Sequence, residues 1–164
     1  MIKPTKLPFE GTKADPDHTK IEIVNLLKKF GIEDYQWTEE MGQPTLAFKT
    51  DVKIDEHVRF YQVIIKPALP AKEFYVFDEH TRMRVKKAIP MYAQGYRILL
   101  NYLKAKLTNI SLGVVKFEEE FLADIAINTD QGKMRLIDVL KARNPGLLGL
   151  PNKTVDLPEE VPRE

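Results

Sequence analysis

The 164-residue chain contains no cysteine, which excludes disulfides, cysteine-ligated zinc, iron–sulfur clusters and thiol catalysis. No apolar run approaches the roughly 20 residues of a membrane-spanning helix, and the N-terminal residues lack the apolar core of a signal peptide. The phosphate-binding Gly-Lys-Ser/Thr loop, the dinucleotide glycine fingerprint and the Gly-x-Ser-x-Gly elbow are also missing. We therefore expect a cytoplasmic protein without membrane contact or cofactor, and a binding protein is favoured over an enzyme.

Acidic residues are absent between Glu79 and Glu118, a window that holds eight positive charges. The whole chain sums to only +1, so the eight cations of this window leave −7 for the remainder. Such a polarised distribution attracts phosphate groups and favours the counterion release that accompanies nucleic-acid binding. The eight cations are Arg82, Arg84, Lys86, Lys87, Arg97, Lys104, Lys106 and Lys116.

Length and composition are typical of one globular domain, since 43% of the residues are hydrophobic and 30% are charged. Three prolines and scattered charges predict a flexible N-terminal arm over residues 1–17. Proline and acidic residues beyond Pro151 predict a flexible tail over residues 151–164. We therefore place a single domain at residues 18–150.

The first half of this domain predicts one helix followed by strands. Thr19 and Glu22 match a capping box, and apolar residues at helical spacing extend from there to a stop at Gly31. Alternation of apolar and polar residues then predicts strands, the last of which we expect to be central because both of its faces are partly apolar. The predicted helix covers residues 19–30, and the predicted strands cover 34–38, 45–50 and 58–66.

A long amphipathic helix dominates the second half and is predicted over residues 90–111, with Pro90 in its first turn. Its apolar stripe consists of Tyr92, Tyr96, Leu99, Leu103, Leu107 and Ile110. The segment 72–87 is compatible with a loop or with a hairpin that turns at Asp78-Glu79. Two short helices are predicted at 118–126 and 133–142. The pattern predicts an α+β fold in which a three- or four-stranded antiparallel sheet packs against the long helix.

The basic window gives the candidate nucleic-acid contacts. Arg82, Arg84 and Lys86 alternate, so they point the same way in an extended segment. Arg97 and Lys104 are seven residues apart and share one face of the long helix. We expect the two cationic stripes, together with Lys87, to be neighbours that follow a phosphate backbone. The alternative is a solvated helix face and a basic loop that are neutralised by acids from elsewhere.

Exposed aromatic rings let single-stranded bases stack. Tyr92 and Tyr96 lie on the apolar stripe of the long helix, so we assign them to the core. Tyr102 lies off the centre of that stripe, and Tyr75 belongs to the segment of undetermined structure. Tyr75 and Tyr102 are therefore the candidates for stacking.

An acidic cluster at Glu118-Glu119-Glu120 continues to Asp124. Glu120 and Asp124 are one helical turn apart, a spacing compatible with a shared divalent cation in a metal-dependent nuclease. A two-metal site needs further carboxylates from other elements, and acids in the first turn of a helix also complement its dipole. We favour this structural role and assign no metal ligand.

The run Lys104-Ala-Lys-Leu107, followed by Phe117-Glu-Glu-Glu-Phe-Leu-Ala123, resembles a family of small proteins from phages, prophages and other mobile elements. In that family, a helix ending in Lys-Ala-Lys-Leu precedes Phe-Glu-Glu-Glu-Phe-Leu-Ala. The resemblance implies a phage-type setting, with a host's cytoplasm as the location, and brings no established activity. Separately, the order helix, three strands, long helix is similar to the core of single-strand annealing proteins, in which a sheet and a helix line a basic groove.

These observations favour an accessory protein that binds nucleic acid, of the single-strand binding or annealing type. Self-association into a homo-oligomer is compatible with the same reading. Two other classes stay open: a module that binds a host or phage protein, for example an acidic one, and the metal-dependent nuclease.

Overall fold

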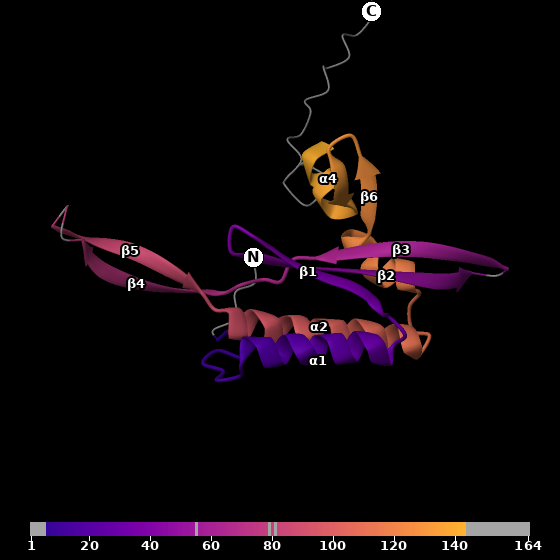
Figure 1. Ribbon diagram of the computed structural model, residues 1–164, viewed down its shortest axis with the longest axis horizontal. Coiled ribbons are helices and arrows are strands. Elements are labelled where there is room, and N and C mark those ends of the chain that lie inside the picture. Colours follow the sequence, from indigo (N-terminus) through magenta and orange to yellow (C-terminus); the bar gives the residue numbers. More distant parts are fainter. Residues whose placement is uncertain (1–5, 55, 79, 81, 144–164) are drawn as a thin grey trace, which may run out of the picture.

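The computed structural model of the chain describes residues 6–54, 56–78, 80 and 82–143, and shows the predicted α+β fold (Figure 1). The predicted C-terminal tail, 151–164, lies outside these residues. Within them, no helix is both long and apolar enough to cross a bilayer.

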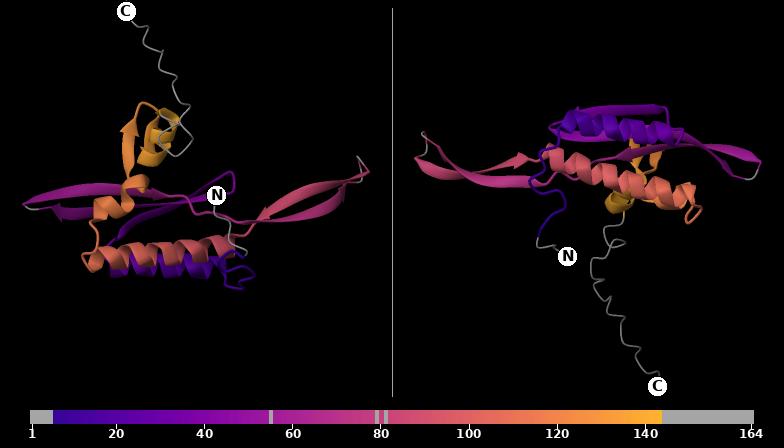
Figure 2. Two further views of the ribbon diagram at one scale, coloured as in Figure 1. Left: turned by 180° about the vertical axis from the view of Figure 1, so that it is seen from behind. Right: turned by 90° about the horizontal axis from the view of Figure 1, so that it is seen from below.

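A three-stranded antiparallel sheet forms the centre of the molecule, in the order β1 (Asp34–Glu40), β2 (Gln43–Ile54) and β3 (His57–Ile65). Helices α1 (Pro16–Lys29) and α2 (Tyr92–Ser111) lie side by side and cover one face of this sheet (Figures 1 and 2). The expectation that the third strand is central is wrong. Because consecutive strands are joined as hairpins, β2 occupies the middle and β3 lies at an edge.

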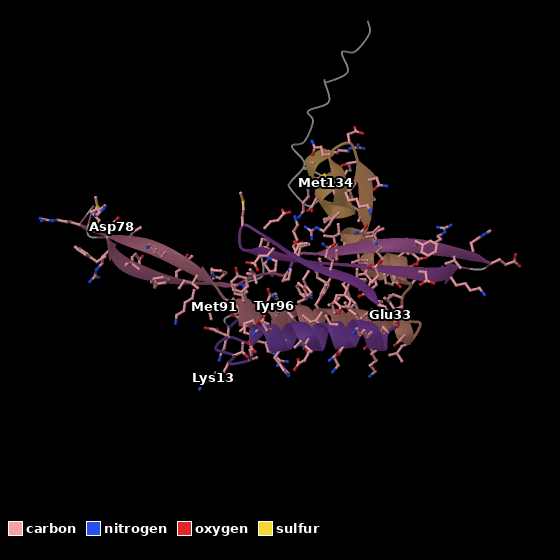
Figure 3. All side chains as sticks on the ribbon, in the orientation of Figure 1. Lys13, Glu33, Asp78, Met91, Tyr96 and Met134 are labelled. Carbon is pink, nitrogen blue, oxygen red and sulfur yellow. The ribbon has the colours of Figure 1, made fainter. Side chains whose placement is uncertain are left out.

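The core lies between the sheet and the two helices, where the central part of the apolar stripe of α2, from Tyr96 to Leu107, is buried as predicted. Tyr96, which is labelled in Figure 3, points toward the sheet and meets Trp37 with ring centroids 5.6 Å apart. Burial of each aliphatic side chain stabilises such a core by about 1.5–3 kcal/mol. The fully buried side chains from the sheet and the two helices include Ile23, Leu27, Leu46, Phe48, Val63 and Leu103.

Helix α1 begins earlier than predicted, because Asp15 caps it by accepting from the backbone N–H of Asp17 at 3.2 Å. Pro16 fits the first helical position, where its fixed φ is favourable and its missing N–H is not needed. The predicted capping box at Thr19 is therefore wrong: Thr19 is buried inside the helix, and its hydroxyl donates to Asp15 O. Gly31, with φ +77°, follows the helix as predicted.

The ambiguous segment 72–87 is a hairpin of β4 (Ala71–Asp78) and β5 (Met83–Pro90). Pro90 ends β5, so the expectation that it opens the long helix is wrong. The β4–β5 hairpin extends away from the body, in the direction opposite to α2 (Figure 1).

The base of the β4–β5 hairpin is fixed to the body by hydrogen bonds. Gln43 Nε2 donates to Pro67 O at 3.1 Å, immediately before the hairpin. The backbone N–H of Met91 donates to Pro70 O at 2.7 Å, which joins the incoming and outgoing chains. Tyr92 then donates its hydroxyl to Gly42 O at 2.9 Å. Both ends of the hairpin are thus tied to the sheet and to the start of α2.

Part of the predicted N-terminal arm contacts the same region. Gln94 is buried on α2 and donates from Nε2 to Pro8 O at 2.7 Å. The structure describes the arm from Lys6 onward, and this bond holds its Pro8 turn against the N-terminal end of α2.

Beyond α2, the chain forms α3 (Phe117–Phe121), a 3₁₀ turn, β6 (Ala126–Thr129), β7 (Gly132–Arg135) and α4 (Leu136–Arg143). The predicted helices at 118–126 and 133–142 are both too long, because their inner ends form the β6–β7 hairpin. This hairpin and α4 lie on the side of the sheet opposite to α1 and α2 (Figure 1).

Gly95 allows α2 to approach the connection between β3 and β4 closely. A Cβ at this position would lie 2.5 Å from Leu69 Cδ2 and 2.9 Å from Ala68 O. We expect Gly95→Ala to lower the free energy of unfolding by about 1–2 kcal/mol, because backbone crowding outweighs the gain in helix propensity. Urea unfolding measures the change, and Thr108→Ala, on the exposed side of α2, should leave stability nearly unchanged. A stabilised Gly95→Ala protein would contradict the close approach.

Candidate nucleic-acid interface

The structure divides the predicted contact residues into two groups that it does not bring together. Arg97, Tyr102 and Lys104 belong to α2, whereas the others lie on the β4–β5 hairpin (Figure 1). The hairpin and the helix extend in opposite directions from their junction, so the expected neighbouring stripes are separate surfaces. The hairpin group consists of Tyr75, Arg82, Arg84, Lys86 and Lys87.

The two cations of α2 that were predicted as contacts, Arg97 and Lys104, differ in their surroundings. Arg97 Nη1 donates to Glu22 Oε2 at 2.6 Å, and both side chains are mostly buried between α1 and α2. Arg97 is therefore neutralised and serves to join the two helices. Lys104 is exposed, and it forms no ion pair in the part of the chain that the structure describes.

Tyr102 is fixed in a polar network and is not a free stacking platform. Its hydroxyl donates to Asp124 Oδ2 at 3.0 Å, and burial together with the Asp124 charge raises the pKa of the phenol. Lys106 Nζ lies 4.7 Å from the centroid of the Tyr102 ring. Asp124 thus holds the hydroxyl of Tyr102, and Lys106 lies over its ring.

The same network ties α2 to the C-terminal segments. Asp124 is only 8% exposed and accepts from Arg135 Nη1 at 3.5 Å. Arg135 also donates to both carboxylate oxygens of Asp138, each at 2.8 Å, which lowers the pKa of Asp138. A hollow of about 200 Å³ beside Tyr102 and Asp124 is otherwise lined mostly by apolar residues such as Leu99. The satisfied hydrogen bonds give this cluster a structural role.

The acidic pair considered for a metal ion does not converge. Glu120 forms an ion pair with Lys106 at 3.5 Å, whereas Asp124 pairs with Arg135. Among residues 6–54, 56–78, 80 and 82–143, no group of three or more potential ligand residues gathers at one point. The nuclease alternative therefore has no geometric support from these carboxylates.

The β4–β5 hairpin has two chemically different faces, because side chains alternate along each strand and directly paired residues share a face. Tyr75 pairs with Lys86, and Phe77 pairs with Arg84. We call this side the cationic–aromatic face; it carries Glu73, Tyr75, Phe77, Arg84, Lys86 and Ala88. We call the other side the apolar face; it carries Lys72, Phe74, Val76, Asp78, Met83, Val85, Lys87 and Ile89.

The cationic–aromatic face is open to solvent. Tyr75 is 68% exposed and Phe77 is 60% exposed, and Arg84 is exposed beside them. Lys86 pairs with Glu73 at 2.7 Å, but both side chains are more than half exposed, and such surface pairs contribute at most about 1 kcal/mol. Lys86 can therefore exchange this partner for a phosphate at little cost.

The register explains what the sequence reasoning missed. Phe77 was not among the candidates, although it alternates with Tyr75 and faces Arg84 once the turn is placed between Asp78 and Met83. Lys87 was among them, yet it lies on the apolar face. Arg82 belongs to the turn, with φ +52°, and lies near the tip. Alternation of side chains in a hairpin that turns near Asp78-Glu79 already places Phe77 on the face of Tyr75, and Lys87 on the face opposite to Lys86.

Comparisons with protein family models, curated proteins and solved structures give no significant match for this chain.

Proposed function

We propose that the protein is a nucleic-acid-binding accessory protein, of the phage or mobile-element type suggested by its sequence, and that the β4–β5 hairpin holds single strands. The observation that supports this most directly is the alignment of two exposed aromatic rings with two cations on one face of a projecting hairpin. Lys104 and Arg97 have no part in this contact, because they lie on a separate surface.

The chemistry of the cationic–aromatic face suits an unpaired strand better than a duplex. Tyr75 and Phe77 offer ring faces on which any base stacks, and this requires bases that are free of a double helix. Arg84 offers a planar guanidinium that binds phosphate through two parallel hydrogen bonds. Lys86 adds a flexible point charge next to the Tyr75 ring. The pattern predicts binding with little sequence preference.

Salt dependence tests the proposal. Three cations, Arg82, Arg84 and Lys86, predict a slope of about −2 for log affinity against log salt with a single-stranded oligonucleotide. The double substitution Arg84→Gln with Lys86→Gln should reduce the slope to about −0.7, because two phosphate contacts are removed. Fluorescence anisotropy over a salt series measures both values, and a duplex of the same sequence should bind more weakly.

Lys104→Gln is the matched control, since it removes an exposed cation that is remote from the hairpin. Its slope and affinity should equal those of the unaltered protein. Absence of salt-dependent binding would contradict the proposal. If Lys104→Gln loses as much affinity as the hairpin variant, the nucleic acid does not bind specifically at the hairpin.

A further inference from the structure

Among the residues that the structure describes, no other element covers the apolar face of the β4–β5 hairpin. Met83, Val85 and Ile89 are all exposed on it, and Phe74 and Val76 are partly exposed. An isolated two-stranded hairpin is marginally stable in water, and it usually needs a packing surface on one side. The opposite face carries the charged residues Glu73, Arg84 and Lys86 beside its two rings and is suited to a charged ligand, so the apolar face is the one suited to a protein partner.

Charges on this face follow an ordered pattern from base to tip. Lys72 is paired with Ile89 at the base, and Asp78 is paired with Met83 at the outer end. Figure 3 shows Asp78 at the far end of the hairpin and Met91 at its base. Between them, the paired Val76 and Val85 are small and β-branched, which permits close approach of a second sheet. Lys87 is paired with Phe74 in the row next to Lys72 and adds to the positive charge near the base. The face is therefore positive over its two rows nearest the base, apolar at Val76 and Val85, and negative at the outer end.

We propose that the apolar face binds the same face of a second copy of this chain, with the two hairpins antiparallel about a two-fold axis. In a two-fold interface the same patch meets itself. When the axis runs across the strands, each end of the pattern meets the opposite end of the partner copy. Lys72 then lies over Asp78 of the partner copy, and the reciprocal contact forms at the other end. A parallel arrangement would place like charges together, which the pattern disfavours.

The apolar contacts fit the same arrangement. Ile89 at the base meets Met83 of the partner copy, and Phe74 packs against Val76 of the partner copy, following the order of the paired rows. Lys87 can lay its aliphatic stem across Val85 of the partner copy and keep its ammonium group at the rim. The cationic–aromatic faces of both copies stay on the outside, so this inference does not depend on nucleic-acid binding.

Charge reversal tests the arrangement in the full chain, with sedimentation equilibrium as the measurement and nuclease-treated protein as the sample. Asp78→Lys and Lys72→Glu should each weaken self-association at least tenfold, because each places like charges at both ends of the interface. An equimolar mixture of the two variants should recover association as a heterodimer, since every end contact is then between opposite charges.

The recovery separates lost charge pairing from a disturbed turn, because Asp78 also accepts from the backbone N–H of His80 at 2.8 Å. Val76→Lys, in the middle of the face, should abolish association in every combination. Phe77→Ala, on the opposite face, should leave it unchanged. A wild-type chain that stays monomeric at all concentrations, or a mixture that fails to associate, would overturn the proposal.

Discussion

Alanine at both Tyr75 and Phe77 should weaken binding of a single-stranded oligonucleotide at least about 30-fold, with little change in the salt slope. Each base stacked on an aromatic ring contributes about 1–3 kcal/mol, so loss of two platforms costs about 2 kcal/mol or more. The phosphate contacts of Arg84 and Lys86 stay in place, which preserves the slope. Fluorescence anisotropy at a fixed salt concentration measures the affinity.

Two matched variants distinguish stacking from a general loss of apolar surface. Phe60→Ala removes a ring that is 84% exposed on β3, away from the hairpin, and should leave affinity unchanged. Tyr75→Phe keeps the ring and removes only the hydroxyl, so it should bind like the unaltered protein. If the double alanine variant binds normally, bases do not stack on this face. If Phe60→Ala lowers the affinity as much as the double alanine variant does, the oligonucleotide contacts the central sheet.

Arg135→Ala should lower the free energy of unfolding by about 3 kcal/mol, the largest stability effect that we expect from one charged residue. Arg135 is the cation shared by Asp124 and Asp138. Its removal leaves the Asp124 carboxylate buried, with the Tyr102 hydroxyl as the remaining donor among the residues that the structure describes. An unpaired buried charge keeps most of its desolvation cost, which explains the size of the effect. Urea unfolding at neutral pH gives the value.

The control is Arg143→Ala, which removes an exposed arginine at the end of α4 and should change stability little. Adding Asp124→Asn to Arg135→Ala should recover part of the loss, because the buried charge is gone. Acid titration gives a further check. The pKa of Asp138 in the folded protein is below its ordinary value of 3.8. The ionised Asp138 therefore contributes its full stabilisation above pH 3.8, and this stabilisation is lost as the pH falls through the folded-state pKa. Arg135→Ala should remove this acid-dependent contribution. If Arg135→Ala lowers the free energy of unfolding no more than Arg143→Ala does, the ion pairs of Arg135 with Asp124 and Asp138 do not stabilise the fold.

The sequence predicted the parts of the fold that have a strong hydrophobic period. The stripe of α2 repeats over five turns, and its central residues Tyr96, Leu99 and Leu103 are buried as expected. The C-terminal elements were harder, because β6 and β7 span only four residues each and are too short to show a period of two. The position of β3 depended on pairing partners, which alternation along one strand does not reveal.

The candidate site was predicted in part for a similar reason. Arg84 and Lys86 were grouped correctly, because their alternation alone places them on one face. Helical spacing put Arg97 on the surface of its own helix, but it could not reveal that Glu22 of α1 lies against it. The hydrogen bond between Tyr102 and Asp124 joins residues from two elements whose relative placement depends on the whole fold. Contacts of this kind follow from tertiary packing and leave no local signal.

The attachment of the hairpin has a consequence for ligand binding. Pro67 is buried, and Pro70 and Met91 are joined by a backbone hydrogen bond, so neither strand has a flexible linker at its root. A hairpin on a flexible linker would lose orientational entropy when it binds a nucleic-acid strand or a second copy, and this loss would reduce the affinity. Because the root of the hairpin is already ordered in the folded protein, the hairpin would meet either proposed ligand in a preorganised direction.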